Sequence, residues 1–101
     1  MADKVASLGE AVRRIGDGST VALGGNTIHR SPCAAIAEMI RQGKKGLTLV
    51  KTAGAYDVDV LCGTGVADAV LAAYVGFENF GLAPRFRRAV ESGRVKLYEH
   101  T

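Results

Sequence analysis

The feature that most constrains this chain is the alternation of short apolar runs with segments of helical periodicity. Four of the runs are short, and the first is also partly β-branched, as in buried strands. These strands are expected at residues 20–23, 47–51, 69–75 and 94–98. Apolar strands separated by helices form a parallel sheet with helices on both faces, joined by right-handed crossovers. The sequence therefore predicts an α/β fold with a largely parallel sheet, and its 101 residues suffice for a single domain, residues 1–101.

The helices between the strands carry start signals that are visible in the sequence. Ser7 and Glu10 have the spacing of a capping box, and Ser31 followed by Pro32 is typical of a cap and a first helical turn. Asp57 is in place to cap a short helix that follows the second strand. Helices are expected at residues 7–15, 32–42, 57–62 and 84–92.

Charge and composition exclude several classes of function. Lys and Arg number 13 against 10 Asp and Glu, and the net charge of +3 suits an anionic small molecule without requiring nucleic acid. There is no Trp, and six Phe and Tyr in total are too few for a nucleic-acid stacking platform. No apolar run is long enough to span a membrane, and the first residues lack a secretory signal. A cytoplasmic protein without membrane contact is expected.

The four residues most typical of metal sites do not form a metal-binding pattern. Two Cys and two His are widely spaced along the chain, so no metal is expected. Two Cys are also too few for a disulfide scaffold, and both are interpreted as reduced thiols.

The loop after the first strand is the first candidate for chemistry. Gly24 and Gly25 follow a strand and precede a helix, a position where backbone N–H groups can approach an anion closely. Arg30 lies in the same loop and suits an anionic group. A tight turn that only requires a positive φ, and a surface arginine, are equally open interpretations. The pattern is neither G-x-G-x-x-G nor a P-loop, so dinucleotide and nucleoside triphosphate sites are disfavoured.

Two further side chains have reactive groups near predicted strand ends. Cys33 falls in a first helical turn and is a candidate thiol, although a small buried residue is favoured. Glu78 follows the third strand and is a weak candidate base or nucleophile; capping a turn or pairing with an arginine is favoured. Basic residues gather over residues 85–96, where a charged helix face, including an Arg87–Glu91 pair, is favoured over a phosphate site.

Longer stretches of the sequence resemble family I coenzyme A transferases. The segments 7–12, 20–32 and 43–50 resemble the family in general. The segments 74–78 and 81–91 resemble the A (alpha) subunit, specifically that of glutaconate CoA-transferase and its steroid-degradation relatives. The similarity covers nearly the whole chain. It implies the coenzyme A transferase fold, of the broad class that includes sugar-phosphate isomerases, and the N-terminal portion of an alpha subunit or a shortened relative.

The resemblance also implies a site. The family's glycine motif, G-x-G-G-F, contributes backbone to an oxyanion and CoA site. This chain has Ala22, Leu23, Gly24, Gly25 and Asn26 there, so the second and third glycines are kept and Asn replaces Phe. Asn26 could add a side-chain donor to an oxyanion. The implied CoA-site residues are Gly24, Gly25, Asn26 and Arg30.

The implied reaction is CoA transfer between an acyl-CoA thioester and a carboxylic acid, with CoA thioester as substrate and no covalent cofactor. The family's nucleophile is a Glu on the B (beta) subunit, and no residue here matches its motif, so Glu78 is not assigned that role. An oligomer with a beta subunit, or with itself, is expected, and the chain alone is expected to be inactive. The alternatives are a non-catalytic self-associating or ligand-binding module of this fold, or part of a hydrolase that opens a ring in a CoA thioester.

Overall fold

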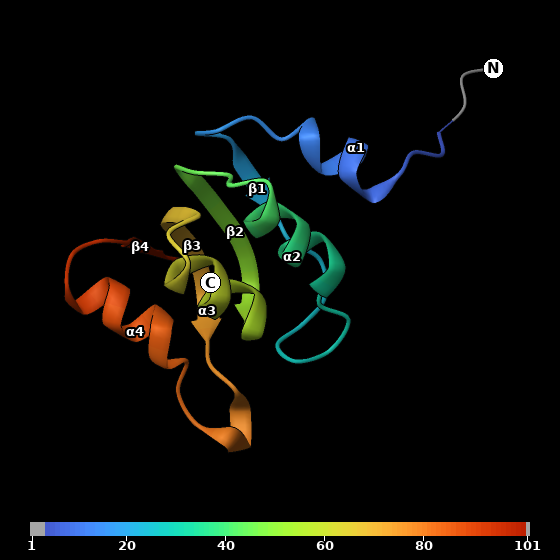
Figure 1. The fold of residues 1–101 in the computed structure, drawn as a ribbon. Coiled ribbons are helices and arrows are strands. Elements are labelled where there is room, and N and C mark those ends of the chain that lie inside the picture. Colours follow the sequence, from blue (N-terminus) through green and yellow to red (C-terminus); the bar gives the residue numbers. More distant parts are fainter. Residues whose placement is uncertain (1–3, 101) are drawn as a thin grey trace.

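Four parallel strands form one sheet in the computed structural model, which describes residues 4–100 (Figure 1). They are β1 (Thr20–Ala22), β2 (Leu47–Gly54), β3 (Ala67–Val75) and β4 (Lys96–Glu99), and their order in the sheet is the order in the sequence. In one row across the sheet Val21 pairs with Leu49, Leu49 with Val70, and Val70 with Leu97. The predicted α/β fold with a parallel sheet is confirmed.

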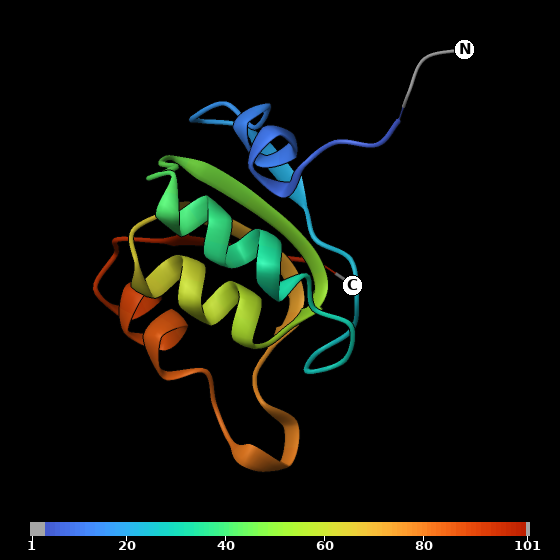
Figure 2. The same cartoon turned by 45° about the vertical axis from the view of Figure 1, so that its right-hand side comes forward.

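The helices are α1 (Leu8–Arg13), α2 (Cys33–Arg41), α3 (Tyr56–Gly63), the 3-10 turn η1 (Glu78–Phe80) and α4 (Pro84–Glu91). Figure 2 shows α2, α3 and α4 side by side on one face of the sheet. Successive right-handed crossovers that always advance to the next strand in the same direction place every connecting helix on the same face. Within residues 4–100 the arrangement therefore differs from the expected helices on both faces.

The main core lies between this helical layer and the sheet. β2 and β3 send alternate residues into it, because successive side chains of a strand point to opposite faces. Fully buried apolar side chains of this core are Ile36, Leu47, Leu49, Val58, Leu61 and Val70. The opposite face of the sheet carries residues that are only partly covered, among them Val50, Leu71 and Tyr98. None of the helices in residues 4–100 has the length and apolar character needed to cross a membrane.

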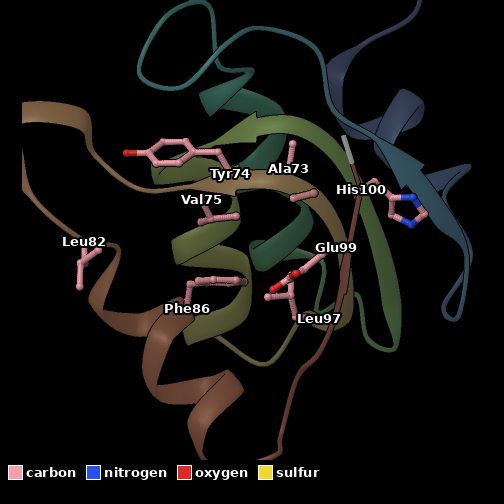
Figure 3. Close-up of a pocket in the computed structure, with 9 residues that line it drawn as sticks. Ala73, Tyr74, Val75, Leu82, Phe86, Leu97, Glu99 and His100 are labelled. Atoms are coloured by element: carbon pink, nitrogen blue, oxygen red, sulfur yellow. The ribbon is translucent and has the colours of Figure 1, made fainter.

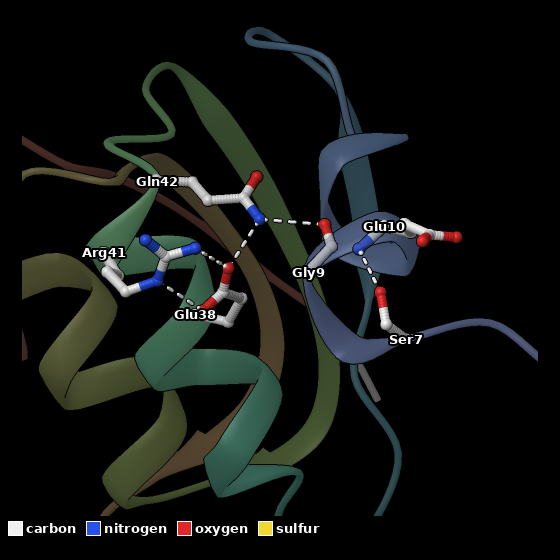
Figure 4. A network of polar contacts seen from close by, with 6 residues as sticks. All are labelled: Ser7, Gly9, Glu10, Glu38, Arg41 and Gln42. Carbon is white, nitrogen blue, oxygen red and sulfur yellow. Dashed lines mark hydrogen bonds and ion pairs between the residues drawn. The ribbon is translucent and has the colours of Figure 1, made fainter.

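A polar network connects α1 to α2 (Figure 4). The Ser7 hydroxyl accepts a hydrogen bond from the Glu10 N–H at 3.2 Å, which confirms the predicted cap of α1. Gln42 Nε2 donates to the Gly9 carbonyl oxygen at 2.9 Å and to Glu38 Oε2 at 2.7 Å. Gln42 therefore attaches the first helix to the end of the second.

Glu38 is the charged centre of this network. Arg41 Nε and Nη2 donate to its two carboxylate oxygens at 2.7 and 2.5 Å. The hydrogen bonds from Arg41, and then that from Gln42, lower the pKa of Glu38 to about 2.

Two local expectations are corrected by the structure. The second helix begins at Cys33 with Pro32 at its N-cap, and the Ser31 hydroxyl donates instead to the Thr27 carbonyl at 3.2 Å. Ser31 is used inside the preceding loop because the chain turns sharply at Arg30, whose φ is +57°. The second strand continues beyond its expected end at residue 51 to Gly54, because Ala53 and Gly54 pair with the end of β3.

Candidate active-site loops at the carboxyl edge of the sheet

The loops that follow β1, β2 and β3 meet at the carboxyl-terminal ends of the strands. The Thr27 N–H donates to the Ala53 carbonyl at 2.8 Å, which connects the first loop to the end of β2. The Thr27 hydroxyl donates to Glu78 Oε1, also at 2.8 Å, although the two residues are 51 positions apart. The structure thus brings Glu78 to the glycine loop. Ligands of parallel α/β sheets bind at this edge.

The glycine loop requires glycine at position 25. The φ of Gly25 is +88°, and a Cβ there would lie 2.5 Å from the Arg30 carbonyl oxygen and 2.7 Å from that of His29. Asn26 and His29 exchange backbone hydrogen bonds of 2.9 and 2.8 Å that close the loop. The tight-turn interpretation of Gly25 is therefore correct.

The same loop leaves two backbone donors free. Gly24 and Gly25 are exposed, and their N–H groups donate to no acceptor within residues 4–100. Apart from its chain neighbours, no atom of the described residues lies within 4 Å of a Cβ built on Gly24, so the space beside it is open. The geometry is compatible with the approach of an anion as well as with a turn.

A buried ion pair lies directly beneath the loop. Lys51 of β2 and Asp57 of α3 place Nζ and Oδ2 2.9 Å apart, and both side chains are fully buried. Lys51 Nζ also donates to the Gly24 carbonyl oxygen. The other carboxylate oxygen, Asp57 Oδ1, accepts from the N–H groups of Ala55 at 3.1 Å and Val58 at 2.9 Å. Asp57 thus accepts hydrogen bonds from N–H groups at the start of α3 while lying within the helix, and it does not occupy the predicted N-cap position.

This pair was absent from the sequence expectations. Lys51 is the last residue of the expected strand 47–51, whereas the structure places it in the interior of β2 with its side chain buried. Buried charges are kept where a partner of opposite sign is within reach. The signal in the sequence was a Lys in a predicted strand followed closely by an Asp in a predicted helix, each on the side of its element that faces the core.

Glu78 has an unusual backbone conformation. Its φ is +55°, and its N–H donates to the Tyr74 hydroxyl at 3.1 Å. Within residues 4–100 the residues other than glycine with positive φ are Thr27, Arg30 and Glu78, all in these two loops. Such conformations persist where surrounding contacts determine them, and they concentrate at functional sites. The expected pairing of Glu78 with an arginine is replaced by the bond from Thr27.

Asn26 and Arg30 belong to the glycine loop, but their side chains are not engaged there. Both residues are exposed, and their side chains make no hydrogen bond or ion pair in the part of the chain that the structure describes. Cys33 is exposed at the start of α2, so the favoured interpretation as a small buried residue is wrong. At Cys62, burial, followed by the nearby Asp59 charge, raises the pKa of the thiol to about 12. The described residues contain no group of three or more His, Cys, Asp or Glu that could hold a metal.

The basic residues of α4 are mostly engaged in ion pairs. Arg87 Nε lies 2.6 Å from Glu91 Oε1, as the spacing predicted. Arg85 Nη1 lies 3.4 Å from Asp59 Oδ2, and Asp59 Oδ1 accepts from the Phe86 N–H at 2.9 Å. The buried Asp59 of α3 therefore binds the N-terminal turn of α4. The basic face of α4 is a charged helix face with ion pairs, as was favoured over a phosphate site.

An open groove of about 710 Å³ lies at the ends of β3 and β4 (Figure 3). Figure 3 shows Val75 and Phe86 between the end of β3 and α4, with Leu82 on the segment that leads into α4. Tyr74 also lines the groove and connects it, through its hydroxyl, to the backbone of Glu78. The groove offers mainly apolar contacts next to the polar loops.

Comparison with known families decides which fold family this geometry represents. The sequence pattern of the family described as "Coenzyme A transferase" matches residues 5–100. The chain belongs to the coenzyme A transferase family. The free N–H groups, the buried ion pair and the Thr27–Glu78 contact are therefore features of a coenzyme A transferase domain.

Two individual relatives are subunits of enzymes that differ in activity. The chain is 44% identical over 99 residues to the A (alpha) subunit of 3-oxoadipate CoA-transferase from Pseudomonas knackmussii, covering 94% of this chain and 35% of that protein. It is 34% identical over 101 residues to the cholesterol ring-cleaving hydrolase IpdA subunit of Rhodococcus jostii, covering 96% of this chain and 33% of that protein.

Among solved structures, glutaconate coenzyme A-transferase from Acidaminococcus fermentans superposes with a TM-score of 0.91 and 33% identity, over 98% of this chain and 32% of that one. The resemblance to alpha subunits of glutaconate CoA-transferase type is confirmed. The chain spans only about a third of the length of these relatives.

Proposed function

We propose that this chain is the part of a coenzyme A transferase alpha subunit that supplies an oxyanion and CoA loop, while a B (beta) subunit supplies the nucleophilic Glu. The observation that carries the proposal is the pair of unengaged N–H groups of Gly24 and Gly25 at the carboxyl end of β1. Membership of the family supports a CoA thioester as the substrate class, and the proposed chemistry uses no covalent cofactor. The alpha-subunit relatives support a heteromeric enzyme.

The proposed chemistry uses these donors where charge develops. When a carboxylate attacks the carbonyl carbon of an acyl-CoA thioester, the carbonyl oxygen gains negative charge. Backbone N–H groups fixed in advance stabilise that charge without reorganising. Asn26 adds a side-chain amide beside them, and Arg30, exposed and without an acidic partner in residues 4–100, suits the phosphates of CoA.

Glu78 has a positioning role in this proposal, not a nucleophilic one. One of its carboxylate oxygens accepts the Thr27 hydroxyl, so the side chain holds the two loops together. We therefore expect the chain by itself to transfer no CoA. The assay is a panel of acyl-CoA donors and acid acceptors with the purified chain, alongside light scattering. Turnover by a monomer that disappears in Glu78→Ala would contradict this assignment.

The loop is tested best at Gly24. A substitution of Gly25 deforms the loop itself, because its Cβ would overlap the Arg30 carbonyl. At Gly24 a methyl group enters open space, so Gly24→Ala changes the approach of a ligand with little effect on the fold. Gly16→Ala is the matched control, because its Cβ makes only an ordinary contact, 3.7 Å from the Ser19 hydroxyl.

Both variants are made in the complete protein with its partner subunit, and acyl-CoA binding is measured by calorimetry. We expect Gly24→Ala to weaken binding or turnover at least tenfold, about 1.4 kcal/mol, while Gly16→Ala matches the parent. Parent-like binding and turnover in folded Gly24→Ala would refute the loop assignment.

A ring-opening hydrolase is the second candidate, because one relative is a cholesterol ring-cleaving hydrolase subunit. The two are separated by the product. A transferase moves CoA to an added carboxylic acid, whereas a hydrolase consumes a ring-bearing CoA thioester with water and needs no acceptor. A thermal shift with sugar phosphates and none with CoA esters would favour the non-catalytic binding module instead.

A further inference from the structure

The buried Lys51 ammonium acts on the peptide unit that joins Gly24 to Gly25. Lys51 Nζ donates to the Gly24 carbonyl oxygen, and the described chain contains no cis peptide bond. In a trans peptide the C=O and the following N–H point in opposite directions. The Gly25 N–H therefore points away from the buried lysine, on the exposed side of the loop.

We propose that Lys51 is a positioning residue, which orients the Gly24–Gly25 peptide so that the Gly25 N–H becomes a fixed donor for the oxyanion. This inference rests on the proposed function of the glycine loop. Without Lys51, the Gly24–Gly25 peptide has no partner in residues 4–100 that would determine which way it faces, because neither its C=O nor its N–H has another hydrogen bond there. Glycine permits both orientations, since it adopts positive and negative φ with similar ease.

A purely structural role explains this pair less well. Leu47 and Leu49 precede Lys51 on the same buried face of β2, so an apolar residue would satisfy the strand. Replacing a buried ion pair by apolar groups is often neutral or stabilising. Besides Asp57, the polar group that Lys51 reaches is the Gly24 carbonyl, which places the ammonium against the candidate site.

Asp57 makes this arrangement possible at low cost. Its Oδ2 lies 2.9 Å from Nζ and balances the charge, while its Oδ1 is held by the N–H groups of Ala55 and Val58. The carboxylate is thus fixed by α3, and it fixes the ammonium in turn. The lysine acts at short range, through the direction and polarisation of one amide group, because a paired charge has little long-range field.

The test removes the contact without leaving a lone buried charge. Lys51→Met with Asp57→Asn deletes both charges, and the Asn oxygen can still accept from Ala55 and Val58. Lys51→Gln with Asp57→Asn is the matched variant, equally neutral but with a side-chain N–H donor for the Gly24 carbonyl. Both are made in the complete enzyme with its partner subunit, and folding is checked by thermal melting.

We expect the Met variant to lose about 10²–10³-fold in kcat, the usual effect of losing one oxyanion donor, with a much smaller change in KM. The Gln variant should recover at least tenfold of that loss. Equal kcat in the two folded variants, or parent-like kcat in the Met variant, would overturn the inference. If the Met variant does not fold, the Gln variant decides: a loss greater than about 10²-fold in it contradicts the role of the donor.

The outcome is distinguishable from failure of the proposed function. Gly24→Ala tests the loop itself and leaves Lys51 unchanged. A parent-like Gly24→Ala removes the basis of both ideas, whereas an impaired Gly24→Ala with indifferent Lys51 variants removes the positioning role alone.

Discussion

The hydrogen bond between Thr27 and Glu78 should contribute measurably to the stability of the loop cluster. Thr27→Val removes the hydroxyl and keeps the shape and the β-branching, so the strain at φ +48° is the same in both proteins. The backbone bond from Thr27 to Ala53 is also kept. Thr27 is only 5% exposed, whereas Glu78 is exposed and regains water when the bond is lost.

A hydrogen bond to a charged group contributes about 1.5–3 kcal/mol, and because water can replace Thr27 at the exposed Glu78 carboxylate we expect about 1 kcal/mol for this one. In a domain of this size such a loss lowers Tm by about 4–8 °C. The assay is urea unfolding of the parent, Thr27→Val, Glu78→Ala and the double variant, with the coupling free energy taken from the cycle. A coupling below about 0.3 kcal/mol, with an unchanged fold, would refute the argument that this bond holds the two loops together.

Three further predictions follow from other parts of the molecule. The Glu38 carboxylate is bonded to Arg41, and its pKa in the folded state is about 2, against an ordinary value of 4.5. The ionised carboxylate therefore stabilises the fold fully above pH 4.5, and this stabilisation is lost as the pH falls towards 2. Glu38→Gln should flatten the pH dependence of the urea midpoint between these two pH values. The buried Cys62 thiol, with its pKa raised to about 12, should be alkylated only after unfolding, whereas exposed Cys33 should react in the native protein at pH 8, as read by mass spectrometry; equal rates would contradict the burial. Gly54→Ala should cost about 1–3 kcal/mol in thermal unfolding, because its Cβ would lie 2.5 Å from a methyl group of α3; a parent-like Tm would contradict the close packing.

Local sequence signals located most of the regular structure. The Ser7 cap, the apolar alternation through Leu47 and Leu49, and the Arg87–Glu91 spacing all depend on residues within a few positions of one another. Such signals need no knowledge of the rest of the chain, because capping, periodicity and i, i+4 contacts are set by the geometry of one element. The resemblance to an alpha subunit was also carried by contiguous segments, and the comparisons confirm it.

The glycine loop itself was visible in the sequence, but its surroundings were not. The order of the strands is set by how successive crossovers pack next to one another. That order in turn places the connecting helices of residues 4–100 on one face of the sheet. Lys51 was expected at the end of a strand, and its burial depends on Asp57, a residue of another element that gives it a partner of opposite charge. Glu78 accepts a hydrogen bond from Thr27, which lies 51 positions away in the sequence. The sequence by itself determined which segments become strands, helices and turns, because those depend on neighbours along the chain. Tertiary structure alone decided which charges could be buried and which loops meet, because burial and long-range pairing are properties of the packed whole.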